Sequence, residues 1–442
     1  MHCTRAVEVA DVAVIGGGVL GAMVARALMR YDVRVVVLEK EVDICQGITR
    51  ANSATIYAGY DNKPGSLKAR LTVAGNEAFA DLCEALDVPF ARKGSLMVAK
   101  GPEGAARLEK KYAQGLANGV KDLRLLRGDE VKDLAPQLEK VHTALYAPST
   151  GVVDPWRLTY HAMENAKANG CVVLADSKVQ AIQKVKDGYT LATTKGEVGA
   201  RAVVNCAGLA AAAVHKLCFE GEVELEVDAS DYLVFDACKE APKQVLFFEE
   251  EDGKGVTLVP LPNGRVLASG GARPLEEEGT ATSRAGLERL REKVAAAYPS
   301  LDHAPLLKTF AALRPNPKSG AESFHDFVIE RPAPTFVSLV GVKTPGLTCA
   351  PLLGEMVAND VAAALRAKEN PQFCGRYHAT HEAGGEVVCL CGSITEGEVR
   401  TAVNAGARSA KGVSRRTGAC LGPCQGERCR SRIEKMLGEN DD

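Results

Sequence analysis

The chain has 442 residues, of which 46% are hydrophobic and 25% are charged, a composition typical of globular proteins. The formal net charge of −2 and the low aromatic content argue against a protein that binds nucleic acid electrostatically. The length predicts two or three domains.

The first apolar stretch, residues 12–29, contains four glycines, so we expect a strand, a turn and a helix there and no membrane span. No basic segment with a small-residue cleavage site precedes it, so we expect no secretory signal. Of the 14 cysteines, those before residue 380 are scattered, as reduced thiols usually are. The sequence therefore predicts a cytoplasmic protein without an integral membrane segment.

Residues 11–15 form an apolar run, three glycines follow, and a helical pattern extends to residue 31. A second apolar run ends at Glu39, and this β–α–β order predicts a parallel sheet. At the strand–helix junction, the motif Gly16-x-Gly18-x-x-Gly21 allows a tight turn, close approach of a pyrophosphate and close helix packing. The helix N-terminus favours phosphates and Glu39 suits a ribose diol, so a dinucleotide site is predicted.

This glycine motif occurs in both FAD and NAD sites. Two later strand-to-helix turns, Val203–Gly208 and Thr344–Thr348, could present backbone amides to a long ligand, which favours FAD. The alternative is that both are ordinary turns. Because no second glycine motif follows Gly208, a nicotinamide site is disfavoured.

The middle of the chain predicts a helix over 67–86, mixed structure over 90–145 and a helix over 160–168, with strands up to residue 205. Between residues 222 and 273 an alternating pattern with Asp-Gly and Asn-Gly turns predicts an antiparallel sheet. A helix over 283–297 follows. A buried strand over 337–340 then leads into an apolar helix that ends near residue 365. The polar segment 367–385 is interpreted as a linker.

Four segments resemble the D-amino-acid-oxidase-like superfamily of FAD enzymes: Asp11–Glu39, Thr49–Gly59, Val203–Gly208 and Val340–Thr348. Residues 51–70, and Leu313–Pro315 followed by Asp326–Ile329, are similar to its branch of L-2-hydroxyglutarate oxidases and glycerol-3-phosphate dehydrogenases. The resemblance implies an α/β fold with a discontinuous, Rossmann-like FAD-binding domain (1–89, 146–215 and 330–366). It further implies an inserted substrate domain whose antiparallel sheet, from about 222–325, is capped by 90–145 (domain limits 90–145 and 216–329).

The same resemblance implies contacts to FAD. Thr49, Asn52 and Ser53 would approach the flavin diphosphate or ring. Val179 would flank the adenine, and Gly346 to Thr348 would meet the ring end. The expected FAD-binding residues are Gly16, Gly18, Gly21, Glu39, Lys40, Thr49, Asn52, Ser53, Val179, Gly208, Gly346, Leu347 and Thr348.

Two residues are candidates for catalysis. The resemblance places Arg314 near the substrate anion, and a guanidinium suits a carboxylate or phosphate; the alternative is a structural salt bridge. Tyr57 stands where relatives commonly carry a histidine that could take a hydroxyl proton. Tyrosines in model peptides titrate at about pH 10, so Tyr57 is a poor base that could orient the substrate. Lys63 and His325 are further polar candidates, for which surface or structural roles are favoured.

Five cysteines lie in the last 54 residues, four of them spaced Cys389-x-Cys391-x32-Cys424-x4-Cys429. Two close pairs of thiolates can hold an iron–sulfur cluster or zinc, and a reducing compartment argues against disulfides. The segment 386–434 resembles the bacterioferritin-associated-ferredoxin-like [2Fe–2S] domain, which favours a [2Fe–2S] cluster in a small helical domain (386–442). Zinc remains the alternative. Cys420 does not fit the spacing and is interpreted as a bystander.

Five cations lie between these cysteine pairs: Arg400, Arg408, Lys411, Arg415 and Arg416. The favoured interpretation is a solvated face of the domain. The alternatives are that these cations offset the negative charge of the cluster or that they dock an acidic electron carrier.

A flavin with an iron–sulfur centre indicates a dehydrogenase that hands electrons to a protein, either an electron acceptor or a second flavoprotein subunit. The favoured substrate is a small anionic hydroxy compound, glycerol 3-phosphate or a 2-hydroxy acid. The alternatives are an amino- or imino-acid dehydrogenase and a non-catalytic electron-relay subunit.

Overall fold

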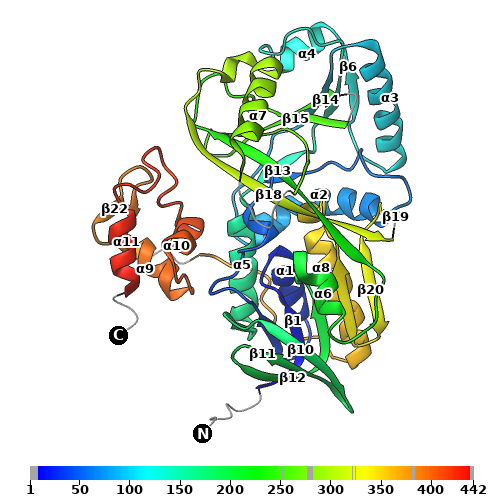
Figure 1. The fold of residues 1–442 in the computed structure, drawn as a ribbon, viewed down its shortest axis with the longest axis vertical. Coiled ribbons are helices and arrows are strands. Elements are labelled where there is room, and N and C mark those ends of the chain that lie inside the picture. Colours follow the sequence, from blue (N-terminus) through cyan, green and yellow to red (C-terminus); the bar gives the residue numbers. More distant parts are fainter. Residues whose placement is uncertain are drawn as a thin grey trace.

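The structure, a computed structural model, describes residues 8–250, 253–275, 282–320, 322–323, 325–379 and 384–438. Figure 1 shows three parts: a lower α/β body, an upper sheet with its helices, and a small C-terminal domain at the side. Of the helices in these described ranges, none has the length and apolarity needed to cross a membrane.

The lower body is built on a mixed sheet. Its central strands are parallel and lie in the order β9 (Val172–Leu174), β2 (Val35–Leu38), β1 (Glu8–Ile15), β12 (Gly196–Asn205) and β21 (Phe336–Val340). Antiparallel strands β10 (Val179–Val185), β11 (Gly188–Thr193) and β20 (Val328–Ala333) extend it. All of β2 and residues 12–15 of β1 are buried, which is why these stretches are continuous apolar runs in the sequence.

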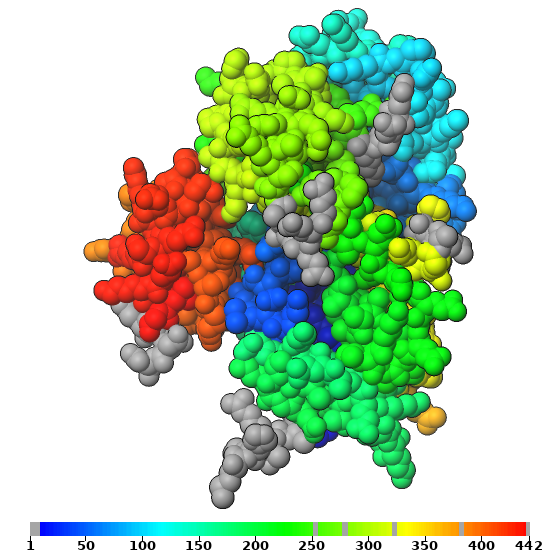
Figure 2. Space-filling view, in the orientation of Figure 1, coloured from blue at the N-terminus to red at the C-terminus, as the bar shows by residue number. Residues whose placement is uncertain are grey.

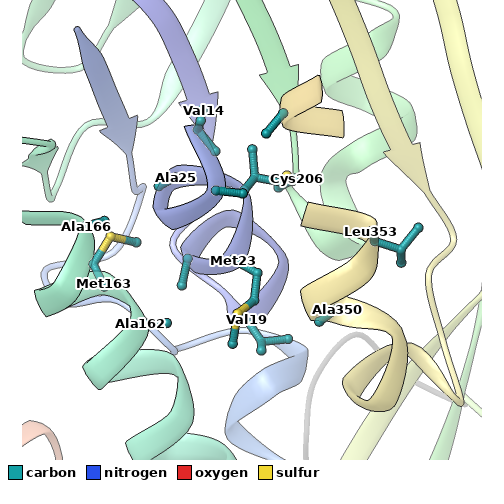
Figure 3. Close-up of a cluster of buried hydrophobic side chains, with 14 of the residues drawn as sticks. Val14, Val19, Met23, Ala25, Ala162, Met163, Ala166, Cys206, Ala350 and Leu353 are labelled. Atoms are coloured by element: carbon teal, nitrogen blue, oxygen red, sulfur yellow. The ribbon is translucent and has the colours of Figure 1, made fainter. Parts of the chain in front are cut away.

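Helices cover this sheet. Helix α1 (Val19–Leu28) lies between α5 (Pro155–Ala168) and α8 (Gly346–Leu365), where Met23, Met163 and Leu353 meet in one apolar cluster (Figure 3). Helix α2 (Leu67–Ala85) packs on α8, and its first turn is capped by the Ser66 hydroxyl. The short helix η2 (Gly208–Ala210) leads into α6 (Ala211–His215), which packs on β21. The α/β fold and the β–α–β opening predicted from the sequence are confirmed.

The upper part is a long sheet with strands in the order β19 (Glu322–Ser323), β18 (Leu306–Ser319), β13 (Glu224–Phe235), β16 (Val266–Ser269), β15 (Gly253–Pro260), β14 (Val245–Glu250), β5 (Ser95–Ala99), β7 (Thr143–Ala147) and β6 (Arg124–Leu126). Strand β17 (Arg273–Pro274) pairs with β13. Its helices are α3 (Pro102–Ala117), α4 (Asp129–Leu134), α7 (Arg284–Ala297) and η3 (Pro299–Leu301). Strands β3 (Thr55–Ile56), β8 (Gly151–Val153) and β4 (Phe90–Arg92) form a small third sheet.

This upper sheet differs from the expectation in one respect. Residues 90–145 do more than cap the sheet: β5, β6 and β7 are strands of it, and β14 pairs with β5 in parallel, while helix α3 packs on β5 and β7. Pairing over about 150 residues leaves no signal in local periodicity. The shared sheet supports the proposed grouping of 90–145 with 216–329 in one domain.

The C-terminal domain has its own small core. A strand pair, β22 (Val387–Cys389) and β23 (Ile394–Thr395), precedes helices α9 (Glu396–Asn404), α10 (Ala410–Thr417) and α11 (Arg430–Gly438). Thr395 and Glu398 form a capping box at the start of α9. Val399, Val413 and Ile433 are fully buried between the helices.

The expected linker, residues 367–385, lies partly outside the described residues, at 380–383. The first part of this segment is bound to the lower body. Backbone hydrogen bonds join Asp32 N to Lys368 O, Asn370 N to Arg30 O and Tyr377 N to Ala85 O, each 2.8 Å long. Residues 367–379 therefore form a strap along the lower body.

Candidate functional site

A cavity of about 530 Å³ extends from the carboxyl ends of β1 and β2 to the face of the upper sheet. A volume of this size is typical of a cofactor or ligand site. The first strand ends contribute Ile15 and Leu38, and the upper sheet contributes Thr257, Ser269 and Arg314. The predicted site residues that line it are Gly16, Gly18, Glu39, Lys40, Thr49, Asn52, Ser53, Tyr57, Val179, Gly208, Arg314, Gly346 and Leu347.

At two positions of the glycine loop there is no room for a side chain. Gly16 has a φ of +105°, and a Cβ added there would lie 2.6 Å from the carbonyl oxygen of Cys206. A Cβ added to Gly21 would lie 1.9 Å from the carbonyl oxygen of Gly16. The first turn of α1 therefore lies directly against the end of β1, as a pyrophosphate cradle requires.

Glu39 holds this loop and also faces the cavity. Its Oε2 accepts a hydrogen bond of 2.7 Å from Gly17 N, and its Oε1 accepts one of 2.9 Å from Glu41 N. Burial raises the pKa of Glu39, although these N–H groups act in the opposite direction. Lys40 and Val179 line the same end of the cavity, where the adenine and ribose of FAD are expected.

The segment after β2 uses its polar groups to shape the cavity wall. Thr49 Oγ1 accepts a hydrogen bond of 3.0 Å from Val19 N, at the start of α1. Asn52 donates to Thr49 O and accepts from Ala54 N. Thr348 is fully buried, and its Oγ1 accepts from Tyr57 N at 3.0 Å. Thr348 therefore positions Tyr57 and is not part of the cavity wall.

The shape and donors of this cavity fit FAD. The glycine cradle, the carboxylate at one end and the three strand-to-helix turns all border the same space. Bound FAD would supply a two-electron acceptor at the end of the cavity that faces the upper sheet.

At that end, Arg314 forms a fork onto Asp228, with Nε 2.6 Å from Oδ1 and Nη2 2.9 Å from Oδ2. The salt bridge considered from the sequence is therefore present, and Arg314 also lines the cavity. A ligand anion would have to approach the third nitrogen, Nη1. Tyr57 also lines this end, and its ring stacks on Phe247 with centroids 6.0 Å apart.

Sequence reasoning missed Lys343. It precedes the strand-to-helix turn before α8, lines the cavity and donates a hydrogen bond to Asn316 Oδ1. Burial, and then the positive charge of Arg314, lower the pKa of Lys343. The sequence signal that could have identified it is its position directly before the turn Thr344–Thr348. The other polar candidates, Lys63 and His325, are exposed and lie outside the cavity wall.

The C-terminal domain brings its cysteines together in pairs. The Sγ atoms of Cys391 and Cys424 lie 3.5 Å apart, close to the ~3.8 Å between two thiolates on one tetrahedral metal at ~2.3 Å. Backbone N–H groups of Arg428 and Gly426 lower the pKa of the Cys424 thiol, which favours the thiolate that binds metal. This pair fits one iron of a [2Fe–2S] cluster, which would supply a one-electron acceptor here.

For Cys429, the structure offers two possible partner thiols, whereas the spacing in the sequence did not include Cys420. Cys429 is buried and its Sγ lies 3.4 Å from Cys420 Sγ, while Cys389 is buried in the same small core. Burial raises the pKa of Cys429 to about 12. In the described ranges, no three His, Cys, Asp or Glu side chains are grouped as a metal-ion site. Cys420 thus competes with Cys389 as the partner of Cys429.

Comparison with known families identifies both parts of the chain. Residues 11–359 match the DAO family, described as FAD dependent oxidoreductase. Residues 387–439 match the BFD-like [2Fe-2S] binding domain. The FAD cofactor and the cluster domain expected from the sequence are thereby confirmed.

Individual relatives agree with this. A glycerol 3-phosphate dehydrogenase of Caloramator mitchellensis is 34% identical, with 97% of this chain and 93% of that protein covered. The mitochondrial L-2-hydroxyglutarate dehydrogenase of Bos taurus is 31% identical, with 60% of this chain and 55% of that protein covered. The FAD-bound L-alpha-glycerophosphate oxidase of Mycoplasma pneumoniae superposes with a TM-score of 0.77 at 26% identity, covering 84% of this chain and 98% of that one.

Proposed function

The chain belongs to the DAO family of FAD dependent oxidoreductases and carries a BFD-like [2Fe-2S] binding domain, and on this premise we propose that it is a glycerol 3-phosphate dehydrogenase. A 2-hydroxy acid is the second candidate substrate, because L-2-hydroxyglutarate dehydrogenases are also relatives. The alignment with the bacterial glycerol 3-phosphate dehydrogenase covers 97% of this chain and so includes most of the cluster domain.

The observation that carries the proposal is the pair of basic side chains, Arg314 and Lys343, in the wall of the cavity that begins at the glycine loop. They face the cavity end opposite Glu39, where the flavin ring is expected. A phosphate or carboxylate on a short carbon chain would be bound there with its hydroxyl carbon near the ring.

Oxidation of the C–OH carbon to a ketone would release a hydride, for which bound FAD would be the acceptor, and one hydroxyl proton. We propose that Arg314 binds the substrate anion while Tyr57 orients the hydroxyl. We assign the proton to Lys343, because it lines the cavity, because burial and Arg314 lower its pKa, and because Tyr57 stands where the family resemblance leads us to expect a histidine. The FAD and cluster residues named above complete the proposed site.

The electron acceptor is proposed to be a protein that docks at the exposed edge of the cluster domain. Cys391 is exposed, and its neighbour Leu390 is 64% exposed, an unusual position for a leucine beside a metal ligand. Arg428 and Arg430 are exposed nearby in sequence, which suits an acidic carrier or a second flavoprotein subunit. A cytoplasmic location, expected from the sequence, is part of the proposal.

The test is an anaerobic titration of the purified holoprotein with glycerol 3-phosphate, 2-hydroxy acids and amino acids, followed by flavin absorbance. We expect bleaching with glycerol 3-phosphate at the lowest concentration. Bleaching by a 2-hydroxy acid or an amino acid alone would reassign the substrate. A flavin that no compound bleaches, although dithionite does, would indicate an electron-relay subunit.

A further inference from the structure

Helix α10 of the cluster domain contacts α5 of the lower body (Figure 1). In the space-filling view, the orange and red C-terminal domain lies beside a blue, N-terminal part of the body (Figure 2). Arg416 of α10 donates from Nη1 to Asp43 Oδ2 at 2.6 Å and from Nη2 to Asp43 Oδ1 at 2.8 Å. The side chains of Arg416 and Asp43 are only 9% and 3% exposed. The guanidinium carbon lies 3.9 Å from the centroid of the Tyr160 ring on α5.

Gly412 makes this close approach possible. It lies one helical turn before Arg416, and a Cβ there would lie 2.7 Å from Asp43 Oδ2. A bidentate ion pair removed from water contributes little net stability but fixes orientation, because each charge left alone would be buried without a partner. The contact therefore has the properties of a specific docking clamp and not of a surface ion pair.

The strap of residues 367–379 leads the chain to the same helix. The side chain of Asn165 on α5 donates to the carbonyl oxygens of Cys374 and Arg376, at 2.9 and 3.2 Å. Asn169, directly after α5, also binds Cys374. Both the strap and the clamp are thus anchored at α5, so the cluster domain is attached to the body at two points.

Asp43 belongs to the loop between β2 and η1 (Ile48–Arg50), which also builds the FAD cavity. Next to Asp43, the side chain of Ile44 packs against Gly17, and Cys45 N donates to Gly17 O at 2.9 Å. A few residues later, Thr49 caps the first turn of α1. One short loop therefore contacts the glycine cradle on one side and the cluster domain on the other.

We propose that the Asp43–Arg416–Tyr160 clamp holds the cluster domain docked on the FAD domain during electron transfer, and that FAD occupancy strengthens this docking through residues 40–50. The transfer step rests on the proposed function; the docking does not. With both cofactors bound, the domain held here would take the two electrons of FAD singly through its cluster and pass them to a protein acceptor. Arg416 and Asp43 act as positioning residues for the flavin-to-cluster step.

The test uses the full-length holoprotein and the variants Asp43→Asn, Arg416→Met and Arg416→Lys. Removing one partner of a buried pair lowers the docked-to-undocked ratio by on the order of thirtyfold. Arg416→Lys keeps the charge over Tyr160 and partly restores docking. Arg331→Gln is the matched control, because Arg331 also binds an aspartate, Asp360, through Nε and Nη2, but in an exposed pair.

Three measurements decide. Solution X-ray scattering should show a larger maximum dimension for Asp43→Asn and Arg416→Met than for wild type and control, and limited proteolysis should release the cluster domain faster. Wild-type protein stripped of FAD should shift in the same direction. After anaerobic mixing with substrate, flavin bleaching should keep its rate, while cluster reduction slows by about tenfold.

The clamp would be ruled out if Asp43→Asn and Arg416→Met both showed the same scattering, proteolysis rate and cluster-reduction rate as the wild type. Unchanged scattering of the FAD-free protein would overturn the coupling to FAD. If substrate bleaches no flavin even in wild type, the proposed function fails; photoreduction of the flavin then replaces substrate, and the docking is judged on the same three measurements.

Discussion

The Sγ atoms of Cys420 and Cys429 lie 3.4 Å apart in the core of the C-terminal domain. The spacing in the sequence makes Cys389 and Cys429 two of the four expected ligands, and Cys389 is buried in the same core. Cys389 and Cys420 are therefore two candidates for the ligand that would share the second iron with Cys429, and only one of them is needed for four ligands.

Serine variants would show whether Cys389 or Cys420 is the fourth cluster ligand. We expect Cys424→Ser and Cys389→Ser to lose the iron and acid-labile sulfide of the cluster while FAD stays bound, because each removes a thiolate ligand. Cys420→Ser is the matched control and should keep both. Iron and sulfide analysis with electron paramagnetic resonance of the reduced protein would measure this. Cluster loss in Cys420→Ser with retention in Cys389→Ser would exchange their roles.

Arg314→Ala should raise the KM for the anionic substrate far more than it lowers FAD content. A hydrogen bond to a charged group contributes about 1.5–3 kcal/mol, so the expected rise is roughly ten- to 150-fold. Arg314→Lys should recover only part of it, because lysine lacks the fork that binds Asp228 and the anion together. An unchanged KM in steady-state assays would leave Arg314 with a structural role only.

The rate should depend on pH through Lys343. Burial and Arg314 lower its pKa, which enlarges the neutral, proton-accepting fraction at any given pH. As pH falls through this lowered pKa, the lysine becomes protonated and kcat/KM should fall with it. Lys343→Met should reduce kcat by about 10²–10⁴-fold and abolish this acid limb.

Lys343→Arg is the control for charge, because arginine stays protonated and cannot accept the proton. If it retains the wild-type pH profile, Lys343 acts through its charge and not as a base.

Tyr57→Phe should lower kcat/KM by about two- to tenfold, the effect of one neutral hydrogen bond to the substrate hydroxyl. The ring contact with Phe247 is kept, so folding and FAD content should not change. Tyr57→His restores the residue common in relatives and should add a titration near pH 6.5 to the kcat/KM profile. A Tyr57→Phe variant with full activity would remove the hydroxyl from the mechanism.

Features encoded over short stretches of chain could be predicted. The β–α–β opening, the turn at Gly16–Gly21 and the acid at Glu39 follow from local periodicity and from backbone positions where only glycine fits. The start of α7 after Ser283 follows from a capping hydroxyl. For the cluster domain, the two close cysteine pairs indicated a metal centre, and the resemblance of residues 386–434 to a known domain favoured [2Fe–2S] over zinc.

Features that join distant segments could not be predicted. The parallel pairing of β14 with β5 and the pair Asp43 and Arg416, 373 residues apart, carry no periodic signal. Their partners are chosen only when helices and sheets that have already formed pack together. Burial then decides which charges and thiols must meet, since a buried polar group without a partner is costly. The amino-acid order was thus sufficient for the cofactors, whereas packing decided how the two redox domains are joined.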